Sequence, residues 1–286
     1  MVARADCGLD ELGRSYIKLV HRIVHVLEAG YSDLSKSTYP GDDGSREVVT
    51  MAVGHAAALG IRQVRAALHD IEGGWEAESA THIRAVFEAA IDVAYLQVTS
   101  GTERADLARF YLAMSRLRLA SIREGMEKNP ASYTHGHREE WLALDGLFGA
   151  HAGVDPGNHW SGVGRGKVRT DAYEYLGKTM EGLDQVAKVA KRRIFEQFGS
   201  PVVHADPAAW LFVPKAADGR MRITADKTSG IHAMPLSTAA LMLAWGVALR
   251  ATERREAVRE LFVDAERLLA DASAWSSMGQ ESGGRK

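Results

Sequence analysis

The chain has 286 residues, of which 46% are hydrophobic, so it is long enough and apolar enough to bury a sizeable core. Its 35 basic and 37 acidic residues leave a net charge of −2, which excludes a bulk electrostatic attraction to nucleic acid or to a membrane. The single cysteine, Cys7, excludes an intramolecular disulfide and favours a reducing compartment. The N-terminus lacks the apolar core of a signal peptide, and the longest nearly apolar run, Leu236 to Leu249, is shorter than the roughly 20 residues of a membrane span. We therefore expect a cytoplasmic protein that has no membrane partner.

The first predicted helix covers about Asp10 to Ala29 and ends at Gly30. One face of it carries the apolar residues Leu12, Tyr16, Leu19, Val20, Ile23 and Leu27. His21 and His25 have the i, i+4 spacing of a metal-binding pair, but they share the opposite face with charged residues. We therefore expect both histidines to lie in solvent.

A polar loop from Tyr31 to Ser45 is predicted to lead into a second helix that reaches about Asp70. The many alanines of this helix permit close packing. His55 and His69 lie on one side of it, and we interpret them as core or boundary histidines and not as ligands.

The stretch from Thr81 to Val98 predicts a central helix, because apolar residues cover most of its circumference at 100° per residue. Such a helix is expected to be buried. It leaves one polar stripe, made of Thr81, Arg84, Glu88, Asp92 and Tyr95. This stripe is expected to face either a patch of solvent or a polar site inside the bundle.

Ser100 and Glu103 have the spacing of a capping box and predict the start of a fourth helix, which ends near Pro130. A shorter helix, Arg138 to about Leu147, and a long polar loop are expected before Thr170. The loop contains the run GVGRGK, residues 162–167, which departs from the phosphate-binding loop pattern and follows no strand. Its basic residues still make the loop locally cationic.

The C-terminal part begins with a long helix from Asp171 to about Phe198, whose later turns are basic. Trp210 to Thr224 reads as two short extended runs joined by an Asp-Gly turn, which predicts a small hairpin. Leu236 to about Asp271 is predicted to form two helical segments, the first apolar and the second amphipathic, and residues 276–286 are expected to be disordered. The sequence therefore predicts a single all-α domain over residues 1–286, a bundle of seven or eight helices with one extended excursion at 210–224.

Two separated segments, RAVFEAAIDVAYL at 84–96 and IFEQFGSPVVHAD at 194–206, resemble an uncharacterised bacterial all-helical family, a domain of unknown function. That family has an R-x-l-f-E helix and a later Y-x-x-x-S-x-x-x-H segment. The matching positions here are Arg84, Glu88, Ser200 and His204, and a phenylalanine replaces the tyrosine.

The chain is also, more distantly, similar to the HEPN group of prokaryotic nucleotide-binding and ribonuclease domains. In that group an R-N-x-x-x-H segment brings arginine and histidine to a scissile phosphate at a dimer interface. Aligned on His204, the arginine position is Gly199 and the asparagine position is Ser200. The resemblance implies a protein that binds nucleotide or RNA, of the phage-defence or toxin type, without the usual catalytic arginine. RNA or a nucleotide and a second copy of the chain are the expected partners.

Under this interpretation Arg84 grips a phosphate, His204 acts as a general acid or base, and Glu88 orients one of them. The three must then converge on one accessible cavity. The expected binding residues are Asp92, Tyr95, Ser200, Arg192 and Arg193. No metal or cofactor is required.

Two alternatives remain open. Arg84 and Glu88 have opposite charge at i, i+4, so they could be a structural ion pair in a non-enzymatic interaction or sensor protein. A metal-dependent bundle oxidase would instead use carboxylates and histidines of facing helices, with Glu78, His82, Glu88 and Asp92 as candidates.

Overall fold

The computed structural model of the protein describes residues 2–36, 45–112, 160–161, 163–191 and 232–283. Within these ranges 89% of the residues are helical and none lies in a strand, which confirms the all-α helical bundle that the sequence predicts. The predicted hairpin at 210–224 and the predicted helix at 138–147 lie outside the described residues. In the described ranges no helix combines the length and the apolar character that crossing a membrane requires.

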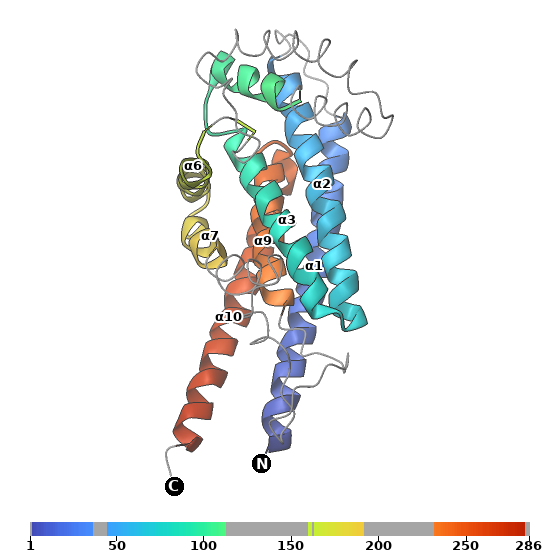
Figure 1. The fold of residues 1–286 in the computed structure, drawn as a ribbon, viewed down its shortest axis with the longest axis vertical. Helices are drawn as coiled ribbons and strands as arrows, with labels where there is room; N and C mark the ends of the chain where they lie inside the picture. Colours follow the sequence, from blue (N-terminus) through green and yellow to red (C-terminus); the bar gives the residue numbers. More distant parts are fainter. Residues whose placement is uncertain (1, 37–44, 113–159, 162, 192–231, 284–286) are drawn as a thin grey trace, which may run out of the picture.

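The helices follow one another along the chain as Figure 1 shows. They are α1 (Val2–Lys36), α2 (Ser45–Gly73), α3 (Glu76–Tyr95), α6 (Arg165–Thr179), α7 (Leu183–Lys191), α9 (Ala233–Ala248), the short 3-10 turn η4 (Thr252–Arg254) and α10 (Arg255–Gly283). Residues 101–112 are also helical and are called the 101–112 helix below.

The apolar helix α9 occupies the middle of the bundle. All of its residues except Met234 and Thr238 are buried, because its sequence has no polar face to offer to solvent. α9 packs against α1, α2, α3, α7 and α10. In Figure 1, α1 and α2 lie on one side of α3 and α9, and α6 and α7 lie on the other. This order places α6 beside α3, where the candidate sites are found.

Glycines allow the central helices to approach closely. A Cβ atom on Gly246 of α9 would lie 2.5 Å from Val93 Cγ1 of α3, and one on Gly60 of α2 would lie 2.5 Å from Leu243 Cδ2 of α9. Real Cβ atoms do not come so near another heavy atom, so the hydrogen side chain is a packing requirement at both positions. α2 and α3 therefore both pack closely against α9.

Several helix limits differ from the prediction. α1 continues past Gly30 to Lys36, because Gly30 is buried against α9, with its Cβ position 3.0 Å from Val247 Cγ1, and does not act as a helix stop. The predicted long helix after residue 170 instead begins at Arg165, so part of the GVGRGK run is its first turn. It breaks before α7 at Gly182, whose φ of 82° leaves the helical region. α10 runs to Gly283, where a disordered tail was expected.

Other predictions are confirmed. His21 and His25 are exposed on α1, and His21 Nε2 lies 2.7 Å from Glu72 Oε1 of α2. His55 is a boundary residue, with its ring 5.8 Å from that of Tyr111 and edge-on to it. The prediction for His69 was wrong, because this residue is exposed. The last part of the chain forms two helical segments, the apolar α9 and the more polar α10.

The contact between α3 and α9 predicts a steric effect of Gly246→Ala. The added methyl group would collide with the buried, β-branched Val93, so we expect a loss of about 1 to 3 kcal/mol in the free energy of unfolding, measured by urea denaturation. Gly54→Ala in α2 is the matched control, because its Cβ would meet only Tyr31 Cε2 at 4.0 Å. The control should gain about 0.5 to 1 kcal/mol from helix propensity. Equal effects of the two variants would contradict the packing argument.

Candidate functional site

The polar stripe of α3 faces helix α6 and the segment at residues 160–161. Thr81 is exposed, Arg84, Glu88 and Asp92 are half-buried, and Tyr95 is buried. Three of these side chains contact residues that follow the long undescribed stretch of the chain. The stripe is therefore largely a seam between helices in the part of the structure that is described.

Glu88 is held by an arginine from α6. Arg169 Nη2 donates a hydrogen bond of 2.6 Å to Glu88 Oε1, and the two side chains are 16% and 34% exposed. Sequence reasoning paired Glu88 with Arg84 one turn away, whereas the ion pair of the structure joins α3 to α6. Because it links two helices and is partly shielded from water, it contributes more than a surface pair within one helix would.

Asp92 and Tyr95 are bound to the segment at 160–161. Trp160 Nε1 donates a hydrogen bond of 2.7 Å to Asp92 Oδ1, and the Trp160 ring lies 6.0 Å from the ring of Tyr95 and 4.9 Å from that of Tyr111. Burial raises the pKa of Tyr95, and its hydrogen bond with Ser161 opposes this shift. Asp92 and Tyr95 therefore anchor a buried tryptophan.

Tyr173 of α6 lies behind the Glu88–Arg169 pair, with its ring 6.4 Å from that of Phe87. Burial raises its pKa far above the usual value, and the charge of Glu88 adds to this effect while that of Arg169 opposes it. Among the described residues the buried hydroxyl has no hydrogen-bond partner. Tyr173 is thus a polar atom in an apolar setting, which carries a cost in stability.

Ser200, His204, Arg192 and Arg193 lie outside the described residues, so the convergence of His204 with Arg84 and Glu88 stays a prediction. The metal alternative finds little support in the described ranges, where no three His, Cys, Asp or Glu residues group as a metal would need. Its candidate His82 instead has Nδ1 2.7 Å from Gln63 Oε1 and Nε2 3.5 Å from Asp70 Oδ2.

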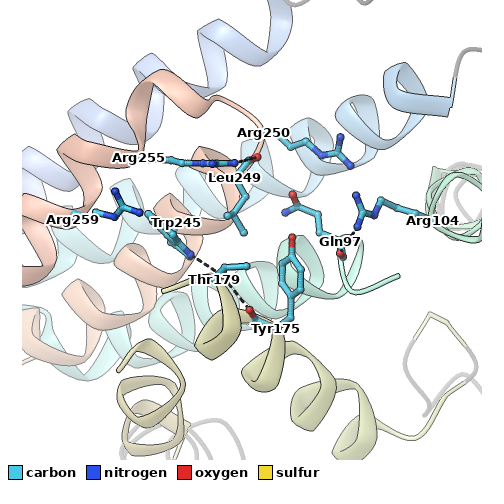
Figure 2. A pocket seen from close by; sticks show the side chains of 9 residues that line it. All are labelled: Gln97, Arg104, Tyr175, Thr179, Trp245, Leu249, Arg250, Arg255 and Arg259. Carbon is cyan, nitrogen blue, oxygen red and sulfur yellow. Dashed lines mark hydrogen bonds between the residues drawn. The ribbon is translucent and has the colours of Figure 1, made fainter. Parts of the chain in front are cut away.

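A cavity of about 370 Å³ lies where the ends of α3 and α9 meet α6 and α10. We call it the arginine pocket. Figure 2 shows its lining: Gln97, Arg104, Tyr175, Thr179, Trp245, Leu249, Arg250, Arg255 and Arg259. These described residues include four arginines and no acid, a lining that favours an anion over a cation.

Two of the arginines are fixed by the C-terminal ends of helices. Arg104 donates to the carbonyl oxygens of Gln97, at 3.1 Å, and Thr99, just past α3. Arg255 donates to the carbonyl oxygens of Ala248, at 3.2 Å, and Leu249, at 3.0 Å, at the end of α9. Free carbonyls and the helix dipole favour a cation at both places.

Hydrogen bonds hold several side chains of the pocket wall. Gln97 Nε2 donates to the carbonyl oxygens of Val93, at 2.9 Å, and Gly246, at 3.0 Å, so its amide ties α3 to α9. Trp245 Nε1 donates to Thr179 Oγ1 at 3.0 Å, and the guanidinium of Arg259 lies 5.5 Å from the centre of the Trp245 ring. Such contacts fix these side chains in place.

The hydroxyl group of Tyr175 lies in the electrostatic field of the pocket's arginines. Burial raises the pKa of its hydroxyl, and the positive charges of Arg104, Arg250 and Arg255 oppose that shift. Three arginines from two parts of the chain therefore act on one hydroxyl group. At neutral pH this hydroxyl is un-ionised and can donate a hydrogen bond.

Sequence reasoning did not identify this pocket. Its residues are spread from Gln97 to Arg259, and no short motif joins them. The available signal was a group of four arginines at 250, 254, 255 and 259, directly after the most apolar helix of the chain.

Comparisons with models of protein families, with curated proteins and with solved structures gave no match.

The seam between α3 and α6 predicts the effect of Glu88→Gln. The substitution removes the countercharge that Glu88 provides to the mostly buried Arg169, so we expect the free energy of unfolding to fall by about 1 to 2 kcal/mol in urea denaturation. Lys188→Gln is the control, since it breaks an exposed i, i+4 pair with Asp184 and should cost less than about 0.5 kcal/mol. A loss no larger than that of Lys188→Gln would show that the Glu88–Arg169 pair contributes little to the free energy of unfolding.

The unpartnered hydroxyl of Tyr173 predicts that Tyr173→Phe stabilises the protein by about 1 kcal/mol at pH 7. The raised pKa adds a pH effect, because the folded state keeps Tyr173 protonated. The stability that depends on this protonation is fully present below the unfolded pKa of about 10 and is lost as the pH rises above that value. The wild type should therefore lose more stability than the variant between pH 9 and pH 11, as measured by urea denaturation at each pH. The exposed Tyr31→Phe should follow the wild type, and a variant less stable than wild type at pH 7 would reveal a hidden partner of the hydroxyl.

Proposed function

We propose that the protein binds a phosphorylated ligand, a nucleotide or RNA, in the arginine pocket, and that it does so in the cytoplasm. One observation carries this proposal: among the described residues, four arginines and no acid line a cavity of about 370 Å³. Guanidinium groups gathered around one cavity repel one another, and an anionic ligand would relieve that repulsion.

Because the cations of the pocket are arginines, phosphate is the favoured anionic group of the ligand. Arginine presents a planar fork of N–H groups that matches the oxygens of a phosphate or carboxylate, and it keeps its charge at any physiological pH. A lone carboxylate carries one negative charge, whereas a phosphate monoester or a nucleotide carries more and so suits a lining with several arginines. The pocket is also within the lower size range of small-molecule sites.

Preorganisation supports the same proposal. A guanidinium has five N–H donors, and the carbonyl contacts of Arg104 and of Arg255 engage two nitrogen atoms of each side chain. The remaining donors are then held in a fixed orientation, which lowers the entropy cost of binding an anion. The un-ionised hydroxyl of Tyr175 adds a neutral donor.

The proposal is confined to binding. Ribonuclease chemistry of the phage-defence or toxin type, which the resemblance to HEPN domains implies, would need His204 beside the bound phosphate. Glu88, the expected orienting residue, is engaged by Arg169 in the described seam. Binding without cleavage would make the chain a sensor of its ligand, in line with the non-enzymatic alternative.

The proposal predicts that wild-type protein binds ATP or a fluorescein-labelled ten-nucleotide RNA, and that Arg250→Gln and Arg259→Gln each weaken this binding about 10- to 100-fold. The reason is the loss of one charge-assisted contact to phosphate. Calorimetry for ATP and fluorescence anisotropy for RNA, both at fixed salt, measure the effect.

Arg62→Gln is the matched control, because Arg62 is exposed on α2, away from the pocket, and its loss changes the net charge equally. It should bind within about twofold of wild type if a general charge effect is absent. The proposal is wrong if neither probe binds, or if the pocket variants bind as well as Arg62→Gln does.

A further inference from the structure

We infer that the arginine pocket selects a ligand with a hydroxyl group beside its phosphate, as in a ribonucleotide, and that Gln97 Oε1 accepts a hydrogen bond from this hydroxyl. The inference rests on the proposed function, because it names the class of ligand that the same pocket would bind. Its basis is the orientation of one buried amide in the inner wall of the pocket.

The orientation of the Gln97 amide follows from its partners. Its nitrogen atom, Nε2, lies 2.9 Å from the carbonyl oxygen of Val93 and 3.0 Å from that of Gly246. Both partners are acceptors, so only the NH₂ group, which has two protons to donate, can occupy this position. The amide oxygen is thereby fixed on the other side of the side chain, since a flipped amide would turn an acceptor toward two carbonyl oxygens.

The oxygen of this amide is a buried acceptor at the cavity. Gln97 is only 1% exposed, and it lines the arginine pocket. Within the described residues both hydrogen bonds of its side chain are made by Nε2, and none is made to Oε1. A buried acceptor without a donor is unfavourable, so a ligand that donates to Gln97 Oε1 gains affinity.

Tyr175 supplies the complementary group. Its hydroxyl points toward the side chain of Gln97 in Figure 2, and it is un-ionised because burial raises its pKa. The side chains of its charged neighbours Arg104, Arg250 and Arg255 have donors only, so they cannot accept its proton in a hydrogen bond. A ligand hydroxyl can donate to Gln97 Oε1 and accept from Tyr175 at the same time, whereas the exocyclic amine of a base can only donate.

This hydroxyl has to lie close to the phosphate of the ligand. The backbone carbonyl of Gln97 accepts a hydrogen bond of 3.1 Å from Arg104 Nη2, so a guanidinium is held next to the residue that carries the acceptor. In a nucleotide the sugar lies between the phosphate and the base. The ribose hydroxyls are therefore the donors that reach Gln97 while the phosphate lies among the arginines, and such hydroxyls distinguish RNA from DNA.

The test compares probes that differ only in the hydroxyls of the sugar. ATP is compared with 2′-deoxy-ATP, 3′-deoxy-ATP and 2′,3′-dideoxy-ATP by calorimetry. A fluorescein-labelled ten-nucleotide RNA made of A, C and G is compared with its DNA counterpart by fluorescence anisotropy. All measurements use one salt concentration, because phosphate binding depends on salt.

Two variants locate the contact. Gln97→Leu removes the acceptor, and Tyr175→Phe removes only the hydroxyl that faces it. Tyr31→Phe is the matched control, because Tyr31 is exposed on α1 and does not line the pocket. Gln97 also ties α3 to α9, so circular dichroism checks the fold of Gln97→Leu. If that variant does not fold, Tyr175→Phe keeps the test decisive, because its hydroxyl makes no hydrogen bond within the described residues.

The inference expects the wild type to bind ATP about tenfold or more tightly than 2′,3′-dideoxy-ATP, or the RNA about tenfold or more tightly than the DNA. This preference should persist in Tyr31→Phe and fall below about threefold in Tyr175→Phe and in folded Gln97→Leu. The two singly deoxygenated analogues then identify the hydroxyl that is bound. A preference among the nucleotides alone identifies a free nucleotide as the ligand, and one among the strands alone identifies RNA.

The remaining outcomes separate the two proposals. If the deoxy probes bind as tightly as their ribose counterparts, while Arg250→Gln and Arg259→Gln weaken all of them, the inference fails and the proposed function stands. A ribose preference that either folded variant, Gln97→Leu or Tyr175→Phe, leaves unchanged also overturns the inference, because another group then recognises the hydroxyl. If no probe binds, both proposals fail.

Discussion

The contact between α3 and α9 is the constraint on which the rest of the structure depends. α9 is apolar on every side, so it can only be buried, and Gly246 lets α3 approach until Val93 fills the space that a methyl group would need. Gln97 then reaches across and donates both amide protons to carbonyl oxygens of the two helices. This bond fixes the ends of α3 and α9 relative to each other, and those ends form the inner wall of the arginine pocket.

Two helix C-termini that lie close together concentrate partial negative charge. The helix dipole makes the C-terminal ends of α3 and α9 partly negative, and backbone carbonyls at the end of α9 and in the turn after α3 can still accept hydrogen bonds there. Arg104 and Arg255 place positive charge there and donate hydrogen bonds to those carbonyls. The same two side chains then supply half of the pocket's arginines, so a requirement of helix capping also holds cationic groups in place for a ligand.

The polar stripe of α3 acts on the pocket indirectly. Glu88 pairs with Arg169, which fixes α6 against α3, and Asp92 binds Trp160 just before α6 begins. α6 in turn carries Tyr175 and Thr179 into the pocket. The residues that resemble the family motif, Arg84 and Glu88, thus lie on the helix that positions the pocket, and one of them holds α6, which carries part of its wall.

The sequence by itself determined the features that depend on local periodicity. The apolar pattern of residues 81–98 and 236–249 predicted buried helices, and the charged neighbours of His21 predicted its exposure, because burial of a helix face follows from spacing along one chain segment. Only the tertiary structure decided which side chains meet across long separations. It paired Glu88 with Arg169, made Gly30 a packing site within α1, and gathered Arg104 with Arg250, Arg255 and Arg259. These outcomes depend on how helices dock, and docking is set by the summed shape of many buried side chains, which no single motif encodes.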